Sequence, residues 1–114
     1  MRILIIFGLA SLLAACGESM TPEQRAQESC ESGTEAILVS RDFVTDRLVA
    51  PATADFPSTN AEGVRSRYVG SCTHEVWAYV DAQNAFGAQI RTKYYAKLKN
   101  PDGAGTWYVV ELEM

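Results

Sequence analysis

Hydrophobic and polar residues alternate through the second half of the chain with the period of a β-strand. Three runs show this pattern, at residues 73–81, 90–99 and 107–114, and turn-forming residues separate them. Three successive strands with short connections predict an antiparallel meander. Even-numbered positions are the more apolar, and the expected core side holds His74, Val76, Ala78, Val80, Ile90, Thr92, Tyr94, Ala96, Leu98, Tyr108, Val110, Leu112 and Met114.

A helical period replaces this alternation between residues 34 and 50. Ile37, Val44 and Leu48 lie on one stripe at spacings of seven and four, while charged residues occupy most of the remaining surface. Pro51 disfavours helical geometry in the residue before it, so the helix is expected to end near residue 50. The whole pattern predicts an α+β fold in which one main amphipathic helix packs on a three-stranded antiparallel β-meander.

A polar segment, residues 16–33, precedes this helix. Within it, Thr21, Pro22 and Gln24 have the arrangement of a helix N-terminus, with a capping threonine, proline in the first helical position and glutamine three residues after the cap. We interpret residues 16–33 as a polar tether with a short helix, and residues 34–114 as a single α+β domain.

The first sixteen residues, MRILIIFGLASLLAAC, have the features of a secretory signal peptide. Arg2 supplies a positive start, and residues 3–15 form an apolar run too short for a permanent membrane span. The ending LAAC resembles the lipobox of bacterial lipoproteins. That resemblance implies a signal peptide at 1–15, cleavage before Cys16, and a palmitate-bearing lipid on the Cys16 thiol and amine. The alternative is an ordinary secretory signal followed by a chance cysteine.

A lipid on Cys16 predicts a protein anchored in the bacterial cell envelope, with the membrane as one partner. Gly17 follows the cysteine where retention in the inner membrane usually requires aspartate, which favours the outer membrane, facing the periplasm. Without residues 1–15 the chain has nine basic and fourteen acidic side chains, a formal charge of −5. Such an acidic chain has no general attraction for nucleic acid.

Two cysteines remain after the lipidated one, Cys30 and Cys72. In an oxidising compartment they are expected to form a disulfide that closes a loop of about 43 residues. Two separate buried thiols are the alternative. Two thiols and one histidine lack the spacing of a metal site, so neither a metal nor another cofactor is expected.

The odd-numbered side of the meander is the most informative surface. Trp, Tyr and Arg are the residue types that dominate binding energy at interfaces, although a solvated sheet side also uses aromatic residues for their strand propensity. The sequence therefore leaves a binding face and a plain solvated face open. We expect Lys93 opposite Glu111, Arg91 opposite Glu113 and Lys97 opposite Trp107. The candidate binding face consists of Trp77, Tyr79, Arg91, Lys93, Tyr95, Lys97 and Trp107.

The connector DAQNAFGAQIR, residues 81–91, joins two of the strands. It is interpreted as a turn in which Asp81 and Asn84 accept backbone hydrogen bonds, Gly87 takes positive φ and Phe86 anchors in the core. A ligand-binding loop is the alternative. The motif residues are Asp81, Gln83, Asn84, Phe86 and Gly87.

Three segments together resemble a small uncharacterised domain of bacterial and phage proteins. They are RDFVTDRLVAPATADFP, VWAYVDAQNAFGAQIRTKYY and TWYVVEL, within residues 36–112, and the string DAQNxFGA is their most specific part. The resemblance implies a helix-plus-meander fold and carries no enzymatic activity.

Catalytic patterns are sparse. His74 is the only histidine, and the neighbouring Glu75 points to the opposite side of a strand. No serine lies in a G-x-S-x-G turn. The favoured function is a binding or interaction module at the envelope with an unknown protein or ligand partner. The alternatives are a phage-exclusion or envelope-stress lipoprotein that blocks a membrane partner, and a hydrolase with an unrecognised site.

Overall fold

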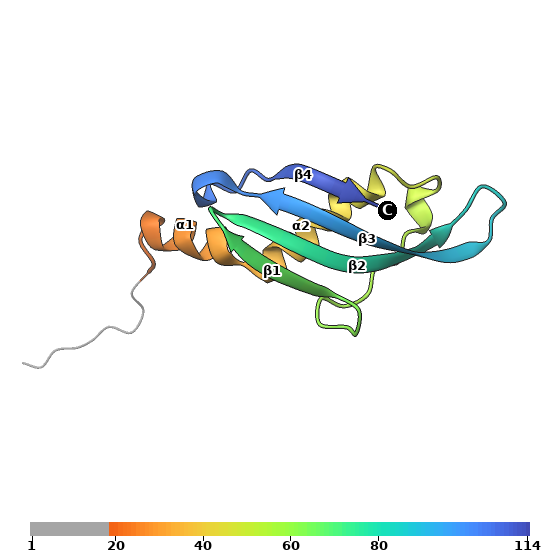
Figure 1. Cartoon of the computed structure of the whole chain (residues 1–114), viewed down its shortest axis with the longest axis horizontal. Helices are drawn as coiled ribbons and strands as arrows, with labels where there is room; N and C mark the ends of the chain where they lie inside the picture. The colour runs from red at the N-terminus through yellow and green to blue at the C-terminus, as the bar shows by residue number, and fades with distance from the viewer. Residues whose placement is uncertain (1–18) are drawn as a thin grey trace, which may run out of the picture.

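A computed structural model describes residues 19–114 as two helices and a four-stranded antiparallel sheet, with α2 behind the sheet and α1 at one end (Figure 1). The sheet order is β1-β2-β3-β4. No helix in these residues is long and apolar enough to cross a membrane. The elements are α1 Pro22–Glu31, α2 Gly33–Thr45, η1 Pro51–Thr53, β1 Arg65–Gly70, β2 Thr73–Gln83, β3 Gln89–Lys99, η2 Pro101–Gly103 and β4 Tyr108–Glu113.

The α+β class is confirmed, but the prediction of three strands is wrong because β1 was missed. β1 pairs with β2 through a two-residue turn formed by Ser71 and Cys72, each at φ 53°. Turns of this kind usually contain asparagine or glycine, which tolerate positive φ. The sequence Ser-Cys therefore carries no hairpin signal of the usual kind.

The short helix expected before residue 34 is α1, and its cap is the one predicted. Thr21 Oγ1 accepts a hydrogen bond from Gln24 N at 3.1 Å, while Gln24 Oε1 accepts one from Thr21 N at 2.8 Å. At its other end Cys30 is buried and forms the predicted disulfide with Cys72. This bond joins α1 to the β1–β2 turn, so α1 packs as part of the folded unit.

α2 packs its apolar stripe against the sheet, as predicted, but ends at Thr45 rather than near residue 50. Pro51 holds Ala50 at φ −127° and ψ 74°, and the chain leaves the helix a full turn before it. Ser40 adds a polar link within the core, because its hydroxyl lies 2.8 Å from the Tyr94 hydroxyl. The buried cluster contains Ala36, Ile37, Val44, Val76, Ala78, Val80, Tyr94, Ala96 and Leu98.

The even-numbered side forms the core throughout β2 and along most of β3, but not at the ends. Ile90 is 47% exposed because it lies near the tip of the β2–β3 hairpin, which extends past α2 (Figure 1). In β4 the pairing skips Val110, which reverses the alternation. Tyr108, before the bulge, therefore lies opposite Lys99 and is 53% exposed, and the skipped Val110 is 52% exposed, both contrary to prediction. Leu112, after the bulge, packs against the core as predicted, whereas Met114 follows the end of β4 and is 46% exposed, also contrary to prediction.

The disulfide gives the first testable prediction. Replacing Cys30 and Cys72 by alanine should lower the free energy of unfolding by about 2–4 kcal/mol, because the unfolded chain loses a constraint on a long loop. Urea unfolding of the full chain measures this. Reduction with dithiothreitol should destabilise the unaltered protein by a similar amount and leave the double variant unchanged. Equal stability of the two proteins would contradict the role given to the bond.

Candidate binding face

The side of the sheet that faces away from α2 is here called the open sheet face. No helix of residues 19–114 covers it, since the core lies on the opposite side (Figure 1). Its side chains form rows across neighbouring strands, in which each residue pairs with the next. The rows are Thr73, Lys99 and Tyr108; Arg67, Glu75, Lys97 and Glu111; Arg65, Trp77, Tyr95 and Glu113; Tyr79 and Lys93; and Asp81 and Arg91.

Trp77 is flanked on both sides by residues that hold its ring. The Arg65 guanidinium carbon lies 3.9 Å from the centroid of the indole, in the range of a cation–π contact. The Tyr95 ring lies on the other side, with centroids 5.5 Å apart and planes inclined by 52°. The aromatic centre of the face is therefore ordered before any partner arrives.

Glu75 organises the adjacent row. Its carboxylate accepts a 2.7 Å hydrogen bond from Tyr95 Oη and a 2.8 Å bond from Arg67 Nε. The Tyr95 hydroxyl, followed by Arg67, lowers the pKa of Glu75. Burial, together with the hydrogen bond to Glu75, raises the pKa of Tyr95 to about 12. At neutral pH the carboxylate is charged and the phenol is a neutral donor.

Arg91 holds the far end of the face in a similar way. Its guanidinium donates to both oxygens of Asp81, at 2.8 and 2.9 Å, and lies 4.1 Å from the centroid of the Tyr79 ring. This pairing lowers the pKa of Asp81 and raises that of Arg91. The prediction that Asp81 accepts backbone hydrogen bonds in the turn is wrong, because its carboxylate is used across the strands.

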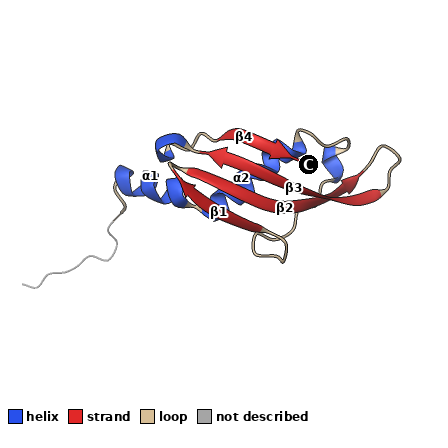
Figure 2. Cartoon of the chain, viewed as in Figure 1, coloured by secondary structure: helices blue, strands red, loops and turns tan. Residues whose placement is uncertain are grey.

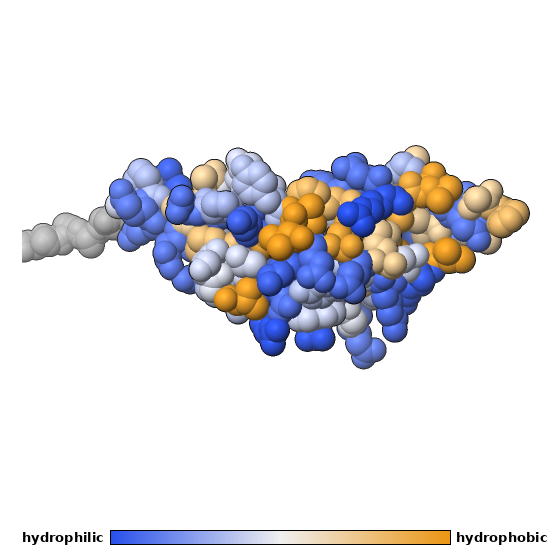
Figure 3. Space-filling model, turned by 45° about the horizontal axis from the view of Figure 1, so that its top comes forward, coloured by the Kyte–Doolittle hydropathy of each residue, from blue (hydrophilic) through white to orange (hydrophobic). Residues whose placement is uncertain are grey.

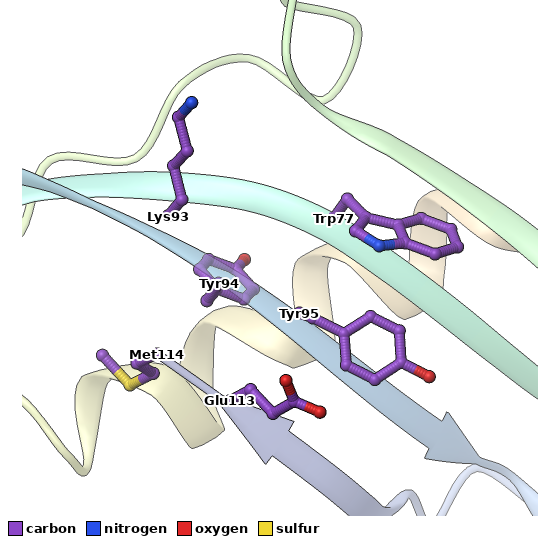
Figure 4. A pocket seen from close by; sticks show the side chains of 6 residues that line it. All are labelled: Trp77, Lys93, Tyr94, Tyr95, Glu113 and Met114. Atoms are coloured by element: carbon purple, nitrogen blue, oxygen red, sulfur yellow. The ribbon is translucent and has the colours of Figure 1, made fainter.

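An open depression of about 370 Å³ lies on this face, between residues of β2, β3 and the end of β4 (Figure 4). Figure 4 shows Trp77, Tyr95 and Glu113 grouped around one part of it, with Lys93 at the other. A hydrogen bond with Glu111 raises the pKa of Glu113. The depression is lined by Trp77, Lys93, Tyr94, Tyr95, Glu113 and Met114.

The predicted pairing of β3 with β4 is wrong in register. The structure places Glu111 opposite Lys97 and Glu113 opposite Tyr95, and Trp107 lies outside β4. Trp107 leaves the strand because its indole turns toward α2, where Nε1 donates to Glu35 Oε1 at 3.1 Å. Trp107 therefore packs against the core, on the side away from the open sheet face.

The other six predicted face residues do lie together, and the structure adds two that were missed. Arg65 and Arg67 belong to β1, which the sequence did not reveal. A signal for them existed, since Arg65, Ser66, Arg67 and Tyr68 alternate in the manner of a strand.

The connector is a turn, as expected. Asn84 Oδ1 accepts hydrogen bonds from Phe86 N at 2.9 Å and Ala88 N at 3.0 Å, and Gly87 takes φ 82°. Gln83 N donates to Thr53 Oγ1 at 2.9 Å. Phe86, however, is 94% exposed at the hairpin tip, where no helix lies beneath it. The prediction that it anchors in the core is wrong.

The remaining candidates lie apart from this face. Cys16 is outside the described residues. His74 is fully buried; its Nε2 lies 2.8 Å from Cys30 O, and its Nδ1 has no partner. In residues 19–114, no three His, Cys, Asp or Glu side chains gather in a way that could hold a metal ion.

Comparison with protein-family models, curated proteins and solved structures finds no match to this chain. Its function must therefore be argued from the geometry of the site.

The two tryptophans give a matched pair of variants. Trp107→Ser should lower the free energy of unfolding by about 2–4 kcal/mol, because it removes core packing and the donor to Glu35. Trp77→Ser should cost about 1 kcal/mol, the size of an exposed aromatic and cation–π contact. Urea unfolding of both variants measures the difference. Equal losses would show that the two rings are not on opposite sides.

The Glu75 pair predicts a pH effect. Tyr95→Phe removes the largest cause of the lowered pKa of Glu75, so that pKa should rise toward its ordinary value. Because the folded pKa is lowered, the contribution of Glu75 to stability is present at neutral pH and is lost as the pH falls through that pKa. In Tyr95→Phe this acid-induced loss should be smaller. Carbon-13 NMR titration of the Glu75 carboxyl measures the pKa.

Tyr79→Phe is the matched control, since Tyr79 lies on the same face but donates no hydrogen bond to Glu75. It should leave the titration of Glu75 unchanged. An unchanged titration in Tyr95→Phe would contradict the assigned cause.

Proposed function

We propose that this chain is a lipid-anchored cell-envelope protein whose open sheet face binds a partner protein. The observation that carries the proposal is the ordered centre formed by Arg65, Trp77 and Tyr95 on a sheet side that no helix of the described residues covers. Tryptophan, tyrosine and arginine are the side chains most enriched among residues that dominate binding energy. Because they are already ordered, little side-chain entropy is lost on binding.

Two lysines complete the chemistry that a partner would meet. Lys93 and Lys97 point to the open sheet face, and in residues 19–114 neither has a carboxylate within ion-pair distance. The three arginines are already held by aromatic rings or carboxylates. A partner with an acidic group beside a flat apolar group therefore fits this face best.

The lipid anchor rests on the sequence of residues 1–16. Five residues separate Cys16 from the first residue of α1, so the folded part can stand no more than about 20 Å from the lipid. α1 lies at one end of the protein and the β2–β3 hairpin at the other (Figure 1). An anchored chain would place the hairpin tip farthest from its tether. Gly17 favours the outer membrane, facing the periplasm.

Binding is favoured over catalysis by the state of the only histidine. His74 lies at 0% exposure between Tyr68 and Trp107, and its Nε2 contacts a main-chain oxygen. A buried ring with this partner is not positioned to activate a nucleophile for an external substrate. A lipoprotein that blocks a membrane partner uses the same kind of surface, and the identity of the captured partner distinguishes it from a housekeeping binder.

Site-specific photo-crosslinking in intact cells tests the proposal. A photo-reactive amino acid in place of Lys93 should yield a crosslinked envelope protein, because this position borders the depression on the open sheet face. Adding Trp77→Ser should reduce the yield severalfold, since the central ring is lost. Cys16→Ala should abolish both palmitate labelling and the crosslink, because the chain then loses its anchor.

Asp42, an exposed residue of α2, provides the control position. The same photo-reactive amino acid there should not capture that protein. Equal capture from both positions, or none from Lys93, would argue against the open sheet face as the binding surface. Palmitate labelling of Cys16→Ala would overturn the anchor.

A further inference from the structure

β1 and β4 are the two outer strands of the sheet, and among residues 19–114 Figure 2 shows no further strand beside either. Outer strands present main-chain N–H and C=O groups with which another strand can pair. In residues 19–114, the one side chain that bonds to the main chain of either strand is Arg47, at 3.4 Å from Leu112 O. A bond of that length is weak, so both edges are open to an added strand.

The two edges carry opposite charges on the same side of the sheet. β1 contributes Arg65 and Arg67 to the open sheet face, and β4 contributes Glu111 and Glu113. Within each strand the two charged residues are separated by one residue, so both pairs have the spacing of neighbours on one strand face. One edge of the sheet is therefore basic and the other acidic, with matching intervals.

A single register satisfies both charge pairs between two copies. β1 and β4 run in opposite directions within one chain, because each strand is antiparallel to the next. A second copy placed beside the first in the same orientation thus brings its β1 antiparallel to β4. When Glu113 lies opposite Arg65 of that copy, Glu111 falls opposite its Arg67. The alternating row of charges then continues from one copy into the next.

The irregular parts of the two strands also coincide. The pairing of β1 with β2 skips Val69, and the pairing of β3 with β4 skips Val110, so each edge has a bulge. In the register above, these bulges lie at the same level, beyond the two charge pairs. Exposed apolar residues then meet one another, since Tyr68 and Val69 are 41% and 42% exposed, and Val109 and Val110 are 37% and 52% exposed.

The distribution of hydrophobic residues on the surface agrees with an apolar contact at β4. Figure 3 shows hydrophobic side chains gathered in the middle of the view, in the region where β4 lies. Exposed apolar residues on an outer strand favour association with another strand.

Pairing of like edges is disfavoured by the same charges. β4 against β4 of a second copy collects four glutamates along one seam, and β1 against β1 collects four arginines. Like charges on adjacent strands are destabilising, so the pattern selects unlike edges.

We propose that the chain associates with further copies of itself head to tail, through antiparallel pairing of β4 in one copy with β1 in the next. A contact of this kind leaves one free edge at each end and permits assemblies larger than a dimer. It does not depend on a partner at the open sheet face.

Photo-crosslinking within β4 tests the proposal in the full chain, in its own membrane. A photo-reactive amino acid in place of Val109 should give a gel ladder of dimers and larger species, with the crosslinked peptide mapping to residues 65–70 of another copy. Dimers alone, with crosslinks to residues 108–113, would replace the proposal by a two-fold contact. Monomers alone, or capture of a different protein, would overturn it.

Charge exchange makes the test specific. R65E/R67E leaves both edges acidic, and E111K/E113K leaves both edges basic, so each variant alone should lose the ladder. Expressed together with different tags, the two should recover it as mixed species, because the acidic edges of one then meet the basic edges of the other. R25E/K99E changes two exposed cations outside β1 and β4 by the same total charge as R65E/R67E and should keep the ladder.

A second variant covers the case in which a charge exchange disturbs folding. Val110 is exposed, so V110K should fold normally while placing a lysine in the apolar part of the seam. Loss of the ladder in a folded V110K protein supports the proposal. An unchanged ladder in V110K, or no recovery when the two folded charge variants are mixed, contradicts it.

Discussion

The disulfide between Cys30 and Cys72 is the constraint on which the arrangement of the elements depends. It joins the end of α1 to a turn whose residues, Ser71 and Cys72, both take positive φ. Conformations of this kind cost about 1–3 kcal/mol in a non-glycine residue and persist only where the surroundings enforce them. The Cys72 N–H donates to the Tyr68 hydroxyl at 3.1 Å, and the main-chain oxygen of Cys30 contacts His74. One covalent bond thereby fixes β1, α1 and a buried ring together.

The position of β1 then determines what the open sheet face contains. Without β1, Trp77 and Glu75 would border an edge. With it, Arg65 stacks on Trp77, and Arg67 joins Tyr95 in bonding Glu75. The disulfide at one end of the sheet thus supports the ordered surface of its open face. It also gives the sheet a basic outer strand to match the acidic one, so the proposed partner face and the proposed self-association share this origin.

Predictions from local pattern succeeded where one element decided the outcome. The cap at Thr21 is correct because capping uses residues within one turn. The inward side of β2 is correct because this central strand has a neighbour on each side and α2 behind it. The prediction that Phe86 anchors in the core failed because a large apolar residue in a turn is buried only when a layer of helix lies beneath that turn. That layer ends before the hairpin tip.

The sequence by itself determined the α+β class, the disulfide pair and the six residues of β2 and β3 on the open sheet face, because each follows from periodicity or cysteine count. Only the tertiary structure decided the fourth strand, the register of β4 and the side taken by Trp107. These depend on contacts between distant segments. The Ser-Cys turn is held by a bond to α1, and the indole of Trp107 is drawn to Glu35 in α2. Alternation along a strand cannot reveal a bulge. The skipped residue Val110 moves Tyr108 and Val109, which precede it, to the sides opposite those predicted, while Leu112 after it keeps the predicted side.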